Sequence, residues 1–287
     1  MLKCISMPAT QIPNYDLHCH STASDGLLAP AELVRRAAGN GVDVLALTDH
    51  DEISGLGEAR ARAAELGLRF IDGVEVSVSW GGISIHIVGL NIDPDNAQLQ
   101  QGLHAIRQGR TERAKRMADD LARAGIPGSL EGAYAFVDNR NLIGRTHFAR
   151  FLVEKRYVND VKSAFQHYLV SGKPGYVPHQ WASLEEALAC IKAGGGVAVV
   201  AHPGRYKLTR TEMRKFLGEF KDGGGAGIEV VTSSHTAEQF LEYAILADEF
   251  GLLASRGSDF HGPGESRVDL GRLPNLAADL KPVWHDW

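Results

Sequence analysis

Short apolar runs rich in β-branched residues recur along the chain, and most of them end in a polar cluster followed by apolar residues at helical spacing. This alternation is typical of βα units, in which strands and helices follow one another around a parallel sheet. Strands are predicted at residues 15–17, 42–47, 69–78, 83–90, 196–200, 227–231 and 252–255. Helices are predicted at residues 30–39, 55–66 and 184–193.

Signals at the helix ends support two of these helices. Ser183 is followed by Glu186, a spacing that predicts a capping box at the start of the helix 184–193. Gly67 and Gly194 stand directly after the helices 55–66 and 184–193. A helix end favours a residue that tolerates positive φ, so both glycines are predicted to adopt it.

The alternation of strands and helices stops between about residues 98 and 180, where apolar residues recur at helical spacing and no strand is predicted. We therefore expect a helical insertion at residues 104–180 that covers a barrel as a substrate-binding lid. The barrel itself is predicted to consist of residues 1–103 and 181–287.

The predicted insertion is basic. It holds 13 Lys and Arg against 7 Asp and Glu, a balance of +6, whereas the rest of the chain carries −11. A solvated face is the commoner explanation of such a charge run. On a helix that begins near Gln98, however, Arg107, Arg110 and Arg113 fall within or beside the apolar stripe. Inward guanidinium groups need a partner, so this arrangement favours a phosphate site.

Length and composition narrow the class of protein. The chain of 287 residues is 44% hydrophobic and 23% charged, which fits an enzyme-sized α/β fold and excludes a disordered chain. Its net charge of −5 gives no support to binding of long nucleic acid. Cys4, Cys19 and Cys190 are few and widely spaced, so a reducing compartment is favoured over a disulfide framework. No apolar run suits a signal sequence or a membrane span, and we expect a cytoplasmic protein.

Six of the twelve histidines lie near the ends of predicted strands, accompanied by three carboxylates. These nine residues are His18, His20, Asp25, His50, Glu75, His86, His202, Asp259 and His261. A single histidine at a strand end is more often a hydrogen-bonded residue than a ligand. The carboxyl ends of barrel strands meet in one place, however, so nine such residues predict one metal centre. Imidazole and carboxylate without thiolate suit Mn, Fe and Zn.

The spacing within two of the motifs agrees with a shared ion. His18 and His20 stand at i and i+2 of a strand, which places both side chains on one face, and Asp259 and His261 repeat the pattern. Cys19 is predicted to point the other way, as a small buried apolar residue.

The motifs that carry these nine residues resemble the successive metal motifs of the PHP (polymerase and histidinol phosphatase) phosphoesterases, in the same order along nearly the whole chain. The motifs are Asp16-Leu17-His18-Cys19-His20-Ser21 with Asp25, Thr48-Asp49-His50, Gly73-Val74-Glu75, His86, Ala201-His202-Pro203 and Gly257-Ser258-Asp259-Phe260-His261. The resemblance implies a distorted seven-stranded β/α barrel, similar to a TIM barrel, with a helical insertion domain.

The resemblance also implies three divalent ions, most often Mn²⁺, with Fe²⁺ or Zn²⁺ as alternatives. The first ion would bind His18, His20, Glu75 and Asp259; the second Glu75, His86 and His202; the third Asp25, His50 and His261. No ligand position is substituted, so the chain does not resemble degenerate PHP domains that have lost their metals. Glu75, Asp25, His50 and Asp259 are expected to be the catalytic residues, because adjacent ions lower the pKa of a bound water enough to supply hydroxide.

Three segments of the insertion resemble the inserted domain of a PHP subgroup that contains nucleotide phosphatases and a short-RNA 5′ exonuclease. They are residues 110–113, 144–150 and 172–178. Two further residues, Arg205 and His235, closely follow the fifth and sixth predicted strands. The residues expected to bind substrate are Arg110, Thr111, Glu112, Arg113, Arg145, His147, Lys173, Tyr176, Arg205 and His235. Tyr176 and Phe148 are aromatic candidates for base stacking, although core packing is the commoner role.

The resemblance implies hydrolysis of nucleotide phosphomonoesters, with the 3′-phosphate of nucleoside 3′,5′-bisphosphates and AMP-like mononucleotides as the expected substrates. Two alternatives stay open at this point. A 5′ exonuclease on short RNA would use the same metals, but it needs an open groove with stacking platforms. A noncatalytic metal-stabilised binding module would require ligand losses that are absent.

Overall fold

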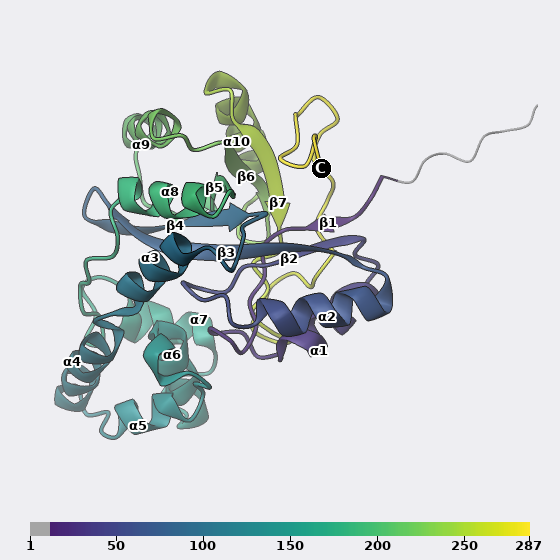
Figure 1. Cartoon of the computed structure of the whole chain (residues 1–287). Helices are drawn as coiled ribbons and strands as arrows, with labels where there is room; N and C mark the ends of the chain where they lie inside the picture. Colours follow the sequence, from purple (N-terminus) through teal and green to yellow (C-terminus); the bar gives the residue numbers. More distant parts are fainter. Residues whose placement is uncertain (1–11) are drawn as a thin grey trace, which may run out of the picture.

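The computed structural model describes residues 12–287, so Cys4 lies outside the described residues. Seven strands hydrogen bond in the order β1 to β7. Beyond β1, the Leu17 N–H donates to the carbonyl of Arg256 at 3.1 Å, and Cys19 pairs with Phe260, so the first and last strands meet. This nearly closed barrel confirms the predicted fold class (Figure 1). The strands are β1 Tyr15–Asp16, β2 Val44–Leu47, β3 Arg69–Trp80, β4 Ile83–Leu90, β5 Val197–Val200, β6 Gly227–Thr232 and β7 Leu253–Gly257.

The parallel arrangement indicated by the alternation of strands and helices was wrong at β4. Strand β4 runs antiparallel to both β3 and β5, whereas the other neighbouring strands are parallel. The cause is the two-residue loop Gly81-Gly82, whose φ angles of 57° and 80° suit a tight hairpin. A parallel connection needs a longer crossover, so β3 and β4 fold back on each other directly.

Ten helices surround or flank the barrel within the described part of the chain. They are α1 Pro30–Gly39, α2 Leu56–Leu66, α3 Ala97–Arg107, α4 Arg110–Arg123, α5 Ser129–Tyr134, α6 Arg145–Glu154, α7 Val161–Ala164, α8 Leu184–Ala193, α9 Arg210–Asp222 and α10 Ala237–Glu249. Short 3-10 turns span Arg140–Leu142 and Pro203–Arg205, and a π-helical turn spans Phe165–Leu169. None of these helices is both long and apolar enough to cross a membrane.

The predicted helix ends are largely confirmed. Ser183 and Glu186 form the capping box at the start of α8, and Gly67 ends α2 with a φ of 66°. The prediction for Gly194 was wrong, because its φ is −73° and the left-handed residue is Gly195, with a φ of 70°. The last turn of α8 therefore extends one residue further before the chain reverses.

The continuous helix predicted from Gln98 is two helices. It breaks at Gly109, whose φ of 85° ends α3 and starts α4 in a new direction. Helix α3 packs on α8 and contributes Leu99 and Leu103 to the main core. Helices α4 to α7 enclose a separate apolar cluster that includes the fully buried Phe148. They gather on one side of the sheet, away from α9 and α10 (Figure 1). Because Phe148 is fully buried in this cluster, it is a core residue rather than a stacking surface.

Side chains alternate along the strands between the outer core and a smaller inner cluster. On β4, Val88 and Leu90 join the inner cluster, and Ile71 does so on β3. Trp284, near the end of the chain, covers this cluster by stacking on Tyr15 with 4.0 Å between the ring centroids. Further along the same faces of β3 and β4, the side chains are the polar Glu75 and His86. The apolar inner cluster therefore lies directly beneath a polar site.

Two helix glycines compare the close packing inside the helical insertion with an open position on a helix of the barrel. A Cβ at Gly132 in α5 would lie 2.0 Å from the Phe151 ring, whereas a Cβ at Gly218 in α9 meets nothing within 4 Å. Gly132→Ala should lower the free energy of unfolding by about 1–3 kcal/mol through overpacking. Gly218→Ala should raise it by about 0.5–1 kcal/mol, because alanine favours helix. Urea denaturation of both variants measures the difference, and equal effects would contradict the packing.

Candidate metal centre

All nine predicted ligands converge at one end of the barrel. They form four overlapping groups in which one ligand atom per residue lies within 4.8 Å of the others. The groups are His20, Asp25, His50 and His261; His18, Glu75 and His202; His18, His20 and Asp259; and His50, Glu75 and His86. Most of these residues follow a strand, as predicted. Glu75 and His86 instead lie within β3 and β4, because the hairpin extends both strands past the site.

The separations within the groups suit ligands that share an ion. The Nε2 atoms of His18 and His20 are 3.2 Å apart. Asp259 Oδ1 lies 3.3 Å from His20 Nε2 and 3.6 Å from His18 Nε2. Ligands bound to one ion at roughly 2.0–2.2 Å are expected about 3.0–3.6 Å from each other at tetrahedral or octahedral angles.

Several ligand atoms are buried and have no hydrogen-bond partner among the described residues. They include His20 Nδ1, Asp25 Oδ1, Glu75 Oε2 and Asp259 Oδ1. Buried polar atoms in native proteins are almost always satisfied, so a cluster of unsatisfied ones indicates an occupant. Imidazole nitrogens and carboxylate oxygens are the donor set of a divalent cation, and the residues present therefore fit a metal centre.

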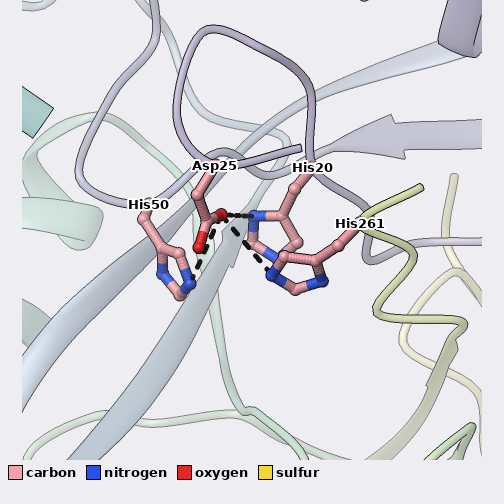
Figure 2. Close-up of side chains that lie close together, drawn as sticks. All are labelled: His20, Asp25, His50 and His261. Atoms are coloured by element: carbon pink, nitrogen blue, oxygen red, sulfur yellow. Dashed lines mark ion pairs between the residues drawn. The ribbon is translucent and has the colours of Figure 1, made fainter. Parts of the chain in front are cut away.

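Figure 2 shows the group formed by His20, Asp25, His50 and His261. Asp25 Oδ1 lies 3.4 Å from His261 Nε2, 3.9 Å from His20 Nδ1 and 4.0 Å from His50 Nε2. The last two distances are too long for hydrogen bonds. One carboxylate oxygen surrounded by three imidazoles at such distances is the arrangement of ligands around a common centre.

Glu75 lies at the middle of the centre. Its Oε1 is 2.9 Å from both His86 Nδ1 and His202 Nε2, and its Oε2 is 2.9 Å from His50 Nδ1. Burial alone would raise the pKa of Glu75, but the neighbouring histidines hold it well below its usual range. The carboxylate is therefore ionised and central. His18, His20 and His50 each join two groups, as Glu75 does, so the residues do not separate cleanly into the three predicted sets.

Two of the nine residues adopt left-handed backbone. The φ angles of His202 and Asp259 are 28° and 53°, a conformation that costs non-glycine residues roughly 1–3 kcal/mol. Hydrogen bonds offset this strain, because Asp259 N–H donates to the carbonyl of His18 at 2.8 Å. Gly257 at the end of β7 lets this strand pass close to His18, since a Cβ at Gly257 would lie 2.3 Å from the His18 Cβ.

Glu229 on β6 is a functional residue that the sequence predictions missed. Its Oε1 accepts a hydrogen bond from His18 Nδ1 at 2.8 Å, and its Oε2 accepts one from the His202 backbone N–H at 2.5 Å. In the neutral His18 ring this contact leaves the Nε2 lone pair facing the site. A signal was available, because a carboxylate within the buried strand predicted at 227–231 needs a partner.

Asp51, also missed, holds one of the predicted substrate-binding arginines. The buried guanidinium of Arg110 forms an ion pair with Asp51 and lies 4.6 Å from the ring centroid of Trp181. Asp51 also accepts hydrogen bonds from the N–H and hydroxyl of Ser77, at 2.7 and 2.8 Å. Arg110 therefore links the start of α4 to the barrel, instead of standing free as a phosphate clamp.

Arg113 lies near Arg145, and Arg145 and His147 both lie near Asp25. Burial and the charges of Arg145 and Arg110 lower the pKa of Arg113 to about 9. Neither Arg113 nor Arg145 has an ion-pair partner among residues 12–287. Burial lowers the pKa of His147 to about 4, so the ring is neutral, and its Nδ1 accepts the Gly144 N–H at 3.0 Å. The proton then resides on Nε2, which is buried without a partner.

The other residues predicted to bind substrate fall into two kinds. Thr111 is half-buried, Lys173 is exposed, and Glu112 is exposed and pairs with Lys115, so the structure does not bring them into the cluster. Tyr176 is half-buried and lies near both Arg113 and Arg145.

Arg205 and His235 flank the metal centre in different ways. Arg205 donates to Asp259 Oδ2 at 2.7 Å and keeps half of its side chain exposed. Both ring nitrogens of His235 are taken by backbone, since Nδ1 donates to the carbonyl of Val230 and Nε2 accepts from the Gly204 N–H, each at 3.0 Å. The predicted substrate contact of His235 is therefore corrected to support of the loop after β5.

A β/α barrel with six histidines and three carboxylates gathered at one end is the architecture of a metal-dependent phosphoesterase. The sequence matches the PHP domain family over residues 16–233, and the chain belongs to that family. A 3′,5′-nucleoside bisphosphate phosphatase of Chromobacterium violaceum is 50% identical over 273 residues, covering 95% of this chain and 96% of that protein.

Two further proteins are similar over nearly the whole chain. A 5′-3′ exoribonuclease of Haemophilus influenzae is 44% identical over 270 residues, covering 94% of this chain and 97% of that protein. The solved structure of a Chromobacterium violaceum amidohydrolase with bound sulfate superimposes with a TM-score of 0.92 at 51% identity, covering 94% of both chains.

Glu229 provides a test of the site that leaves its ligands intact. Glu229→Gln keeps the size of the side chain but weakens its contact with His18, so metal affinity should fall about 10- to 100-fold. Equilibrium dialysis with Mn²⁺ measures this change. The control is Glu238→Gln, an exposed carboxamide substitution at the start of α10. Equal affinity in both variants would show that Glu229 does not orient His18.

Proposed function

We propose that this chain hydrolyses nucleotide phosphomonoesters, removing the 3′-phosphate of nucleoside 3′,5′-bisphosphates and acting on AMP-like mononucleotides. The observation that carries this proposal is that Arg145 and His147 lie near Asp25 of the metal centre, with Arg113 next to Arg145. A substrate with two phosphates needs one place for the phosphate that reacts and another for the one that does not. The similarity to a bisphosphate phosphatase over 95% of the chain agrees with this choice.

The reacting phosphate would lie at three divalent ions, with Mn²⁺ as the leading choice and Fe²⁺ or Zn²⁺ as alternatives. The proposed ligands are His18, His20, Glu75 and Asp259 for the first ion, Glu75, His86 and His202 for the second, and Asp25, His50 and His261 for the third. When bound, such ions lower the pKa of water and stabilise charge on phosphoryl oxygens. Glu75, as the ionised residue shared between ions, would hold them at a fixed spacing.

The phosphate that does not react would lie against Arg113 and Arg145. Both guanidinium groups lack an anionic partner, and an incoming phosphate would relieve their mutual repulsion. His147 Nε2–H would donate to the same phosphate or to the bridging ester oxygen. Bound sulfate in the similar Chromobacterium violaceum structure is consistent with an anion site in this fold.

The chain's own residues would orient the substrate between these two sites. Arg205, which reaches over Asp259 with half of its side chain exposed, is placed to contact a phosphoryl oxygen at the entrance. Tyr176, close to Arg113 and Arg145, would border the nucleoside. Because the Val177 carbonyl holds Arg113 and Asp259 holds Arg205, these two guanidinium groups require little ordering when substrate binds.

A second candidate is 5′ exonuclease activity on short RNA, because an exoribonuclease is 44% identical over 94% of this chain. An exonuclease would use the arginine cluster for the terminal 5′-phosphate and the metals for the adjoining diester. The two candidates differ in the bond cleaved, not in the residues used.

Turnover of two substrates separates these candidates. With Mn²⁺ supplied, release of inorganic phosphate from a nucleoside 3′,5′-bisphosphate is compared with release of mononucleotides from a 5′-phosphorylated RNA trimer. We expect kcat/KM for the bisphosphate to exceed that for the trimer. The reverse order would make the exonuclease the principal activity.

Arg113 tests the second phosphate site. A charge-assisted bidentate contact contributes on the order of 1.5–3 kcal/mol, so Arg113→Ala should lower kcat/KM for a 3′,5′-bisphosphate roughly 10- to 100-fold. The loss with p-nitrophenyl phosphate, which has one phosphate, should be much smaller. Arg116→Ala, an exposed arginine of the same helix, is the matched control. Equal losses on both substrates, or none on either, would reject the clamp.

A further inference from the structure

Arg150 in α6 is one of the few buried charged residues of the helical region, with 5% of its surface exposed. Its guanidinium makes a bidentate contact with Glu265, at 2.8 and 2.9 Å, and donates to the backbone carbonyl of Asp25 at 2.6 Å. All three hydrogen bonds cross from the helices to loops of the barrel. Because Nε and Nη2 are taken by these contacts and the charge is paired with Glu265, Arg150 is a link within the protein rather than a phosphate ligand.

The two loops that Arg150 joins carry neighbouring members of the metal centre. One loop contains Asp25 itself, and the other is the turn 262–266 that follows His261. In that turn the hydroxyl of Ser266 accepts the backbone N–H of His261 at 2.7 Å. The carbonyl of His261 in turn accepts the N–H of Leu27 at 2.7 Å. Arg150 therefore closes a ring of contacts around Asp25 and His261, whose side chains are 3.4 Å apart.

Helix α6 also carries residues of the proposed phosphate site. His147 precedes Arg150 by three positions, so both side chains lie on the same face of the helix. A second buried arginine, Arg110, also joins the helices to a loop of the barrel. It forms an ion pair with Asp51, the residue that follows His50 in the sequence. Both buried guanidinium contacts between the helices and the barrel thus end beside members of the group in Figure 2.

We infer that Arg150, held by Glu265, is a positioning residue for the ion at Asp25, His50 and His261. This inference rests on the proposed assignment of an ion to that group. Arg150 would fix the distance between the two loops before the ion binds, which lowers the ordering needed on binding. The helical insertion would then be a structural part of the metal centre as well as a cover for substrate.

The test is metal binding, measured by equilibrium dialysis and elemental analysis over a range of free Mn²⁺. Arg150→Met should weaken the third Mn²⁺ about 10- to 100-fold and leave the other two bound. Glu265→Gln should do the same, and the double variant should lose little more than either single variant, because both act through one contact. Excess Mn²⁺ should restore the activity of Arg150→Met, because a weakened site fills again at higher free metal.

The matched control is Arg123→Met, an exposed arginine of α4 whose ion-pair partner is Asp120. Glu265→Gln, which keeps the size of the side chain, carries the test if Arg150→Met does not fold. Unchanged binding of the third ion in the variants that fold, even with a lower melting temperature, overturns the inference alone. A wild-type protein that binds fewer than three ions at saturating Mn²⁺ overturns the three-ion proposal, and the inference with it.

Discussion

The structure depends on one buried carboxylate. Glu75 has no exposed surface, is ionised, and lies within 3.4 Å of nitrogen atoms from five histidines of different loops and strands. A buried anion is strongly unfavourable unless positive charge surrounds it, so the barrel must bring cationic or metal-bound groups to this point. Its position within a hairpin strand, above the apolar inner cluster, fixes where the other loops have to meet.

The helical region also contacts the loops that carry the metal centre. Four of its arginines form two pairs that differ in what they contact. Arg110 and Arg150 are bound by Asp51 and Glu265 and fasten the helices to the loops of the metal centre. Arg113 and Arg145 have no such partner in the described part of the chain and carry the charge that the proposed phosphate would neutralise. The basic balance of the insertion thus has both a structural and a binding component.

Much of the fold and of the metal centre could be predicted from the sequence, because the signals within a single strand or helix are strong. The seven strands, the capping box at Ser183 and the convergence of nine residues follow from short-range patterns. The antiparallel β4 depends on the short Gly81-Gly82 hairpin, which the alternation of strands and helices in the rest of the chain does not reveal. The roles of Glu229, Asp51 and Glu265 depend on contacts between distant segments, and only folding reveals that Arg110 already has a partner.

The most direct test of the account is phosphate release by Glu75→Gln at saturating Mn²⁺, with a nucleoside 3′,5′-bisphosphate as substrate. Glutamine keeps the size of the side chain but removes the charge on which the histidines converge. The account predicts that turnover falls to background while the far-UV circular dichroism stays that of the wild type. Wild-type turnover in this variant would contradict a reaction centred on Glu75.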